Sequence, residues 1–196
     1  MTMNCSIPAL MRAASALLLA VALGVSGPPA AQAAPAESPA GLGETAVRTA
    51  SPTILGTLRI PRFGAEFAVQ IGEGIGERDV LNHMVGHFPR SAPAGGLGNF
   101  ALAGHRVTYG KPLYNIHTLV IGDPIYVDTA DGRFEYRFRS SEYVDPSAIE
   151  VTYPVPHQSG SAVRDRIITF VACSPMGSTA ERVIAYGVFE SFTPAG

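Results

Sequence analysis

Cys173 is a residue whose type and position suggest nucleophilic chemistry. It follows the apolar run 166–172 and precedes the turn residues 174–177. A residue at the end of a strand lies at the rim of a β-barrel and not in its core, so a substrate can reach it. The thiol can therefore act as a nucleophile, or it can serve as a small buried apolar side chain. Its position alone leaves both interpretations open.

His105 and Arg182 are candidates to activate that thiol. A thiol with the reference pKa of about 8.5 is only a few per cent ionised at pH 7, so it needs a nearby base or cation. His105 is the best placed of the five histidines, because it follows the apolar run 99–103 and a turn glycine. Arg182 opens an apolar run nine residues after Cys173. If the two runs pair antiparallel, the guanidinium reaches the same rim, where it favours the thiolate and stabilises an oxyanion. The alternative is a surface arginine paired with a neighbouring glutamate.

The other histidines do not predict a metal site. His83 and His87 have the spacing of two ligands on one helical face. Gly86 and a nearby proline disfavour a regular helix there, so we predict no metal. His117 lies in an expected helical turn, and His157 lies in a proline-rich loop.

Short apolar runs punctuated by glycine and proline must position these side chains. Phe134, Tyr136 and Phe138 alternate with charged residues, which is typical of a half-buried strand, and the preceding Asp131-Gly132 pair indicates a hairpin. Helical turns are expected only near 79–84 and 112–119. Seven or eight short strands predict a mostly β fold that closes, or nearly closes, into a barrel with one or two short helices. The runs are 54–60, 66–71, 99–103, 124–128, 134–138, 166–172 and 182–189.

Residues 1–33 have the pattern of an export signal. Arg12 precedes an apolar run over 13–25, and small residues lead to an Ala-Gln-Ala site that ends at Ala33. A transmembrane helix needs about 20 apolar residues, more than this run supplies. We therefore expect a cleaved secretory signal peptide, with an uncleaved membrane anchor as the alternative.

The remaining composition indicates one exported, folded domain. The chain has 196 residues, of which 46% are hydrophobic and 15% charged, and this excludes a disordered chain. Residues 34–52 are expected to be a flexible linker and residues 53–193 the folded domain. The net charge of −2 without a basic block disfavours nucleic acid as a partner. Two cysteines cannot build a disulfide scaffold, and cleavage would remove Cys5 and leave Cys173 as a single thiol.

The order and spacing of these motifs resemble those of sortases. Residues 98–106 resemble the sortase strand that delivers the catalytic histidine. Residues 169–173, with Arg182 nine residues later, resemble the Thr-Leu-x-Thr-Cys…Arg signature. The likeness runs over 54–189. The segments most similar to class E sortases of high-GC Gram-positive bacteria are 58–61, 104–112 and 119–125.

This resemblance implies a closed eight-stranded sortase-type β-barrel and a cysteine transpeptidase that needs no cofactor. Cys173 would attack the Thr–Gly bond of a C-terminal sorting motif, with Leu-Ala-x-Thr-Gly preferred over Leu-Pro-x-Thr-Gly. His105 would exchange protons with the leaving group and the incoming amine, and Arg182 would hold the substrate backbone and the oxyanion. The implied partners are surface proteins with such motifs and an amine of a lipid II-like peptidoglycan precursor. We expect a monomer outside the cytoplasm, secreted or anchored to the outer face of the membrane.

Three further residues are candidates for substrate binding. Ala172 stands where the sortase signature has a threonine, so one hydroxyl that would contact substrate is missing. Tyr109 and Tyr114 lie in the loop after His105 and are expected either to line the substrate groove or to pack against the fold.

Two other functions stay open on the sequence. An L,D-transpeptidase is a second kind of exported cysteine acyl-transferase, but that family has Ser-His-Gly-Cys at its nucleophile, where this chain has Phe-Val-Ala-Cys at 170–173. A non-catalytic barrel that binds the cell envelope is the other alternative, and Ala172 is the feature in its favour.

Overall fold

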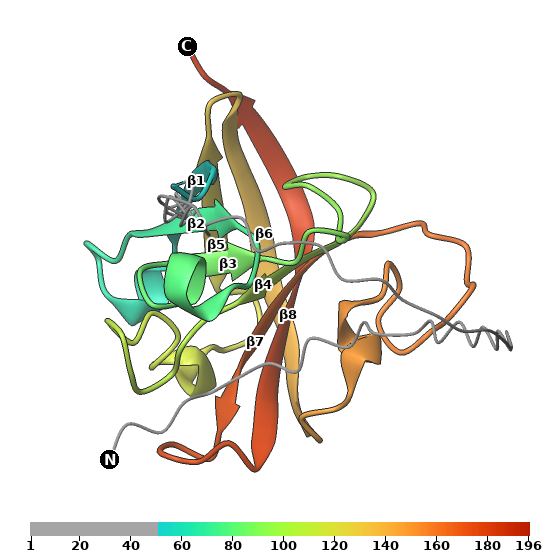
Figure 1. The fold of residues 1–196 in the computed structure, drawn as a ribbon. Coiled ribbons are helices and arrows are strands. Elements are labelled where there is room, and N and C mark those ends of the chain that lie inside the picture. The colour runs from blue at the N-terminus through green and yellow to red at the C-terminus, as the bar shows by residue number, and fades with distance from the viewer. Residues whose placement is uncertain (1–50) are drawn as a thin grey trace, which may run out of the picture. The chain divides into compact units, whose positions relative to one another are not determined.

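The computed structural model of this chain describes residues 51–196 (Figure 1). The predicted export segment, 1–33, lies outside the described residues, as does the predicted linker up to residue 50. Within residues 51–196, no helix has the length and apolar character that crossing a membrane requires.

Eight strands close into one barrel, in the order β1-β2-β3-β4-β7-β8-β6-β5. The prediction of a mostly β, closed eight-stranded barrel is therefore confirmed. The strands are β1 (Ile54–Arg59), β2 (Val69–Glu73), β3 (Val85–His87), β4 (Gly98–Ala103), β5 (Pro124–Thr129), β6 (Gly132–Val144), β7 (Arg166–Ser174) and β8 (Glu181–Pro194).

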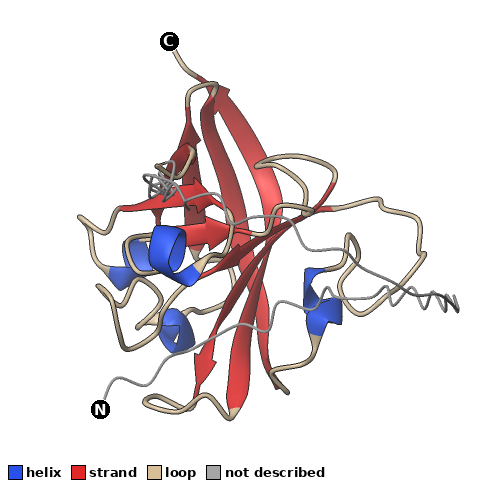
Figure 2. Cartoon of the chain, viewed as in Figure 1, coloured by secondary structure: helices blue, strands red, loops and turns tan. Residues whose placement is uncertain are grey.

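Helical structure is limited to short turns, shown in blue in Figure 2. The expected turns near 79–84 and 112–119 are present in part, as a single π-helical turn and a 3-10 turn. Two further 3-10 turns were not predicted, because turns of three or four residues carry no readable apolar period. The turns described in residues 51–196 are η1 (Pro61–Phe63), η2 (Glu77–Leu81), η3 (Ile116–Thr118) and η4 (Ile149–Thr152).

The predicted strands differ from the observed ones mainly in length. The hairpin expected at Asp131-Gly132 joins β5 to β6, where Thr129 pairs with Gly132. Gly132 has φ +142°, and a Cβ there would lie 2.2 Å from the carbonyl oxygen of Thr193, so only glycine fits. The run 66–71 was placed too early, since β2 begins at Val69. Strand β3 was missed, because three residues are too few for an alternating pattern.

Strand β7 is buried on both faces, which explains its unbroken apolar sequence. Ile168, Phe170 and Ala172 belong to the cluster that fills the barrel. Val171 belongs to a second cluster, with Val151 and Ile184, on the opposite face of β7 and β8. Successive residues of a strand point to opposite faces, so Cys173 follows Val171 onto this outer face.

Candidate active site

Cys173 and Arg182 are direct partners across β7 and β8. Residues opposite each other in an antiparallel pair place their side chains on the same face of the sheet. The thiol and the guanidinium therefore share the outer face of the barrel, as the antiparallel pairing expected from the sequence requires. The two strands lie side by side, and the connection between them lies at one end of the barrel (Figure 1).

His105 reaches the same end of the sheet from a third strand. Strand β4 runs parallel to β7, and their last pair is Ala103 with Val171. The amide of Gly104 extends this ladder by donating to the carbonyl oxygen of Val171 at 3.1 Å. His105 follows Gly104 directly, so it lies just beyond the end of β4 at the same end of the sheet as Cys173. The ends of three adjacent strands, β4, β7 and β8, thus bring the histidine, the cysteine and the arginine to one end of the sheet.

All three candidate side chains are buried, and burial lowers the pKa of His105 and of Arg182. His105, Cys173 and Arg182 are 2%, 4% and 5% exposed. Burial lowers the pKa of His105, and the charge of Glu77 partly opposes this. A lowered pKa favours the neutral imidazole, which can accept a proton from a thiol. Burial also lowers the pKa of Arg182, with the charge of Asp145 acting in the opposite direction.

The sulfur of Cys173 is disulfide-bonded in the structure of the full chain. The prediction of a single thiol concerns the chain after residues 1–33 are cleaved. Because only a thiolate attacks a carbonyl carbon, chemistry at Cys173 requires the reduced form.

Arg182 is held at the start of β8 by the backbone. Its Nη1 donates to the carbonyl oxygens of Thr179 and Glu181, both at 3.0 Å. A guanidinium has five N–H donors in a rigid planar fork. The two hydrogen bonds from Nη1 orient the guanidinium, which lies on the same face of the sheet as Cys173.

An apolar groove adjoins Arg182 on the same face. It encloses a cavity of about 50 Å³. One wall comes from β7 and β8, and the other from the connection 145–165, which includes η4. The lining residues are Phe88, Val144, Pro146, Ala148, Ile149, Val151, Thr152, Val171, Arg182 and Ile184.

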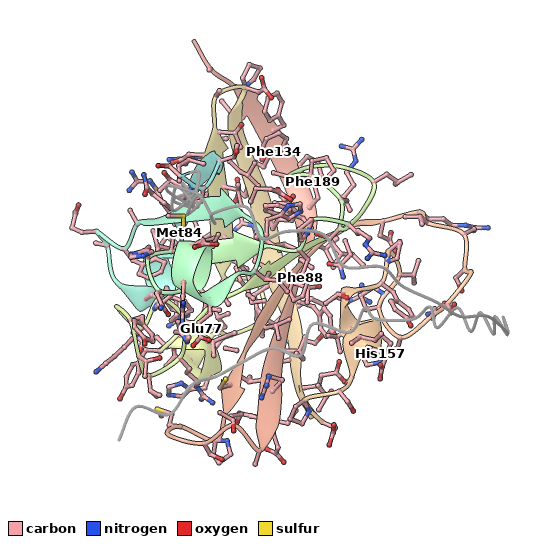
Figure 3. The ribbon with its side chains drawn as sticks, in the orientation of Figure 1. Glu77, Met84, Phe88, Phe134, His157 and Phe189 are labelled. Atoms are coloured by element: carbon pink, nitrogen blue, oxygen red, sulfur yellow. The ribbon has the colours of Figure 1, made fainter. Side chains whose placement is uncertain are left out.

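A polar cluster attaches the connection 145–165 to the sheet. His157 on the connection contacts Glu142 of β6 through Nε2, and the hydroxyl of Tyr186 donates to the same carboxylate at 2.6 Å. Figure 3 labels His157 beside the long strands, and it labels Phe88, which packs against the cluster on the outer face of β7 and β8. These contacts hold the outer wall of the groove in place.

Asn82 is a site residue that the sequence analysis missed. Its Oδ1 lies 3.3 Å from Nε2 of His105. Asn82 caps the turn η2, which begins at Glu77 (Figure 3), and one carboxylate oxygen of Glu77 is buried without a hydrogen-bond partner. No spacing in the sequence links these residues to His105. The only signal for Asn82 in the sequence was that it is a polar residue inside an expected helical turn.

Replacing Asn82 by alanine is expected to lower kcat/KM for peptide cleavage by about 10-fold, the cost of one hydrogen bond that orients a catalytic side chain. The loss should fall on kcat rather than on KM, because Asn82 acts through His105. Steady-state kinetics measure both. Asn115→Ala is the control, since Asn115 makes no side-chain cap at its own turn. Equal rates for the two variants would contradict a role for Asn82.

The tyrosines proposed for substrate binding lie in different surroundings. Tyr109 is 42% exposed, and its ring centroid lies 4.9 Å from that of His105. Tyr114 is 43% exposed, and its ring lies 5.9 Å from the ammonium of Lys111. Tyr109 therefore adjoins His105, whereas the described contact of the Tyr114 ring is with Lys111.

The side chain of Ala172 faces the barrel core. It is 2% exposed, belongs to the core cluster, and pairs directly with Val183 of the same cluster. It therefore points away from the face that carries Cys173. This placement favours a packing role for the methyl group over a substrate contact.

Replacing Ala172 by threonine is expected to destabilise the fold by about 1–3 kcal/mol, because it overfills a packed core and buries a hydroxyl. Thermal unfolding measures the loss. Ala172→Val is the matched control, since it adds a similar volume without the hydroxyl. Faster peptide cleavage by the threonine variant, but not by the valine variant, would instead assign the hydroxyl a place in substrate binding.

Comparisons with known proteins agree on one family. The model of the sortase domain matches residues 58–190. Sortase SrtE1 of Streptomyces coelicolor is 41% identical over 137 residues, which cover 66% of this chain and 38% of SrtE1. Sortase SrtE2 of the same organism is 32% identical over 95 residues, 46% of this chain and 36% of SrtE2. The chain thus matches less than half of the length of either relative.

Solved structures show the same likeness. Sortase E1 from Streptomyces coelicolor, determined with a tripeptide in its active site, is 37% identical with a TM-score of 0.67, and the match covers 72% of this chain and 91% of that one. Sortase E from Streptomyces avermitilis is 31% identical with a TM-score of 0.65 over the same shares of the two chains.

Proposed function

The chain belongs to the sortase family, and from this premise we propose that it is a cysteine transpeptidase with Cys173, His105 and Arg182 as its catalytic residues. The observation that carries the proposal is that these three buried side chains lie at the neighbouring ends of β4, β7 and β8, with Cys173 and Arg182 directly paired. Family membership argues against the L,D-transpeptidase alternative.

The first chemical step forms a thioacyl enzyme. Neutral His105 takes the proton of the thiol, and the thiolate sulfur bonds to the threonine carbonyl carbon of a sorting motif. The bond from that carbon to the glycine nitrogen then breaks, and His105 returns its proton to the departing amine. Arg182, held by the carbonyl oxygens of Thr179 and Glu181, donates hydrogen bonds to the oxyanion of the tetrahedral intermediate.

The groove beside Arg182 supports an extended apolar peptide as the acyl donor. Its walls are mostly apolar, and its cavity of about 50 Å³ suits small side chains. We propose a Leu-Ala-x-Thr-Gly motif at the C-terminus of surface proteins, in keeping with the likeness to class E sortases. The acceptor is an amine of a cell-wall precursor. The site of action is the outer face of the cell membrane, which the predicted export signal supports.

The test is a peptide assay with the full chain, a Leu-Ala-x-Thr-Gly reporter and a glycine-type amine. A reductant is included, because Cys173 is disulfide-bonded in the structure. The expected result is Thr–Gly cleavage, a thioacyl adduct on Cys173 by mass spectrometry, and a peptide–amine product. A Leu-Pro-x-Thr-Gly peptide is the matched control for the motif. If neither peptide is cleaved and no adduct forms with either, the proposal is overturned in favour of a binding barrel.

A further inference from the structure

A second cavity lies at the end of the barrel opposite Cys173. Strands β4 and β7 run parallel from the pair of Gly98 with Arg166, and Cys173 follows at their far ends. The cavity, of about 270 Å³, adjoins their first residues, between the β3-β4 connection and the β5-β6 hairpin. One of its wall residues, Phe134, is labelled in Figure 3 at the end of the long strands away from the β7-β8 connection.

The walls of this cavity are continuous with the barrel core. Ile71, Phe100 and Val127 are buried members of the core cluster, and Leu55 and Phe134 pack against that cluster. The mouth of a β-barrel is a common place for a ligand pocket, which is typically apolar with a few polar groups. Such pockets measure about 300–1,000 Å³, so a ligand of this smaller cavity is a small molecule.

Hydrogen bonds hold the β3-β4 connection, which forms one wall. The amide of Ala92 donates to the carbonyl oxygen of Asn99 at 2.9 Å, and the amide of Gly95 donates to the hydroxyl of Tyr136 at 2.6 Å. Tyr136 is 1% exposed, so the core fixes its hydroxyl. The wall residue Ala94 lies between these two anchors. The cavity is therefore formed without a ligand, which lowers the cost of binding one.

The polar side chains at this cavity carry a net negative charge. Glu73 lies at the end of β2, Asp131 lies in the hairpin after β5, and β1 lies between β2 and β5 in the sheet. The two carboxylates thus line the mouth from both sides of β1. Nδ1 of His87 lies 2.8 Å from Oε2 of Glu73. No arginine or lysine is among the described lining residues, so the lining stays negative even when His87 is charged.

Apolar walls below a negatively charged mouth suit an amphiphilic cation. We propose that the cavity binds a small organic monocation, whose apolar chain lies among the core side chains and whose ammonium lies at Glu73 and Asp131. The like charges at the mouth disfavour a carboxylate of the same length, and a neutral molecule lacks the attraction. Because the cavity and Cys173 lie at opposite ends of the barrel, this ligand is neither the acyl donor nor the acceptor. The site is therefore independent of the proposed function.

Three linear six-carbon probes test the charge requirement. The full chain is titrated with hexylammonium, hexanol and hexanoate, and two-dimensional NMR spectra of its amides give the dissociation constant of each probe. We expect hexylammonium to bind about 5-fold more tightly than hexanol, the effect of an ion pair at a partly exposed site, and hexanoate to bind most weakly. Equal constants for hexylammonium and hexanol, or tighter binding of hexanoate, overturn the inference.

A shorter probe tests the apolar wall. Butylammonium should bind about 10-fold more weakly than hexylammonium, because two fewer methylene groups are buried. The same spectra locate the ligand, and we expect the largest amide shifts at Leu55 in β1 and at Asp131 in the hairpin. Largest shifts at Cys173 and Arg182 would instead place the probe in the groove and overturn the inference, as would the absence of saturable binding.

Variants assign the charge preference to the two carboxylates. Asp131→Asn and Glu73→Gln should each reduce the preference for hexylammonium over hexanol, whereas Glu66→Gln, at an exposed position outside the cavity, should keep it. If Glu73→Gln does not fold, Asp131→Asn alone decides. A preference that is unchanged in the folded variants overturns the inference. Binding is expected to be the same in Cys173→Ala, so loss of peptide cleavage and loss of binding are separate results.

Discussion

Replacing Cys173 by alanine is expected to abolish the thioacyl adduct and to lower peptide cleavage by about 10³-fold or more, because the proposed covalent intermediate forms on its sulfur. The change removes one sulfur atom from a side chain that is 4% exposed, so the barrel should still form. Peptide cleavage followed by chromatography, with mass spectrometry of the intact protein, measures both effects.

The matched control is Cys5→Ala, since the chain has only two cysteines. This variant should cleave the reporter at the rate of the unmodified chain under reducing conditions. Circular dichroism of both variants tests whether the barrel is intact. Cleavage by Cys173→Ala at the unmodified rate would rule out covalent catalysis at this position.

Replacing Arg182 by lysine should lower kcat by about 10²-fold with a smaller change in KM. Lysine keeps the positive charge but lacks the planar fork, so it loses the separate donors that leave Arg182 free to contact an oxyanion while its Nη1 bonds to Thr179 and Glu181. Loss of one oxyanion donor typically costs a factor of this size. Steady-state kinetics with the reporter peptide separate the two constants.

The control for Arg182 is Arg164→Lys, at an exposed position before β7. It should leave both constants as they are. A kcat of Arg182→Lys within about threefold of the unmodified value would show that charge alone suffices, and the proposed oxyanion contact would then be wrong. A thermal unfolding midpoint that falls together with kcat would instead point to lost backbone anchoring.

Local patterns in the sequence predicted the strands that carry the site. The apolar run 166–172 is β7 without its last two residues, and Arg182 lies in β8 opposite Cys173. A tight connection forces two adjacent strands to pair antiparallel, so nine residues of spacing were enough to predict this contact. The Asp131-Gly132 hairpin was predictable for the same reason, since only neighbouring residues determine it.

Contacts between distant segments were not predictable in this way. Asn82 lies 23 positions before His105, and its turn η2 had only a weak helical pattern. The direction of the Ala172 side chain, into the barrel core, was also missed, although alternation along β7 requires it to point away from the side chain of Cys173. What the sequence does not state is which face of β7 is the barrel interior, because both faces are apolar.

The sequence by itself determined the chemistry that this chain can attempt: a thiol, an imidazole and a guanidinium, each at the end of an apolar run that forms a strand. Only closure of the barrel decided that β4 lies parallel to β7, so that His105 and Cys173 both follow the paired segments at the same end of the sheet. The same closure brought the carboxylates of Glu73 and Asp131 to one cavity at the opposite end of the barrel. Strand order and burial arise from packing the whole chain around one core, and no local spacing encodes them.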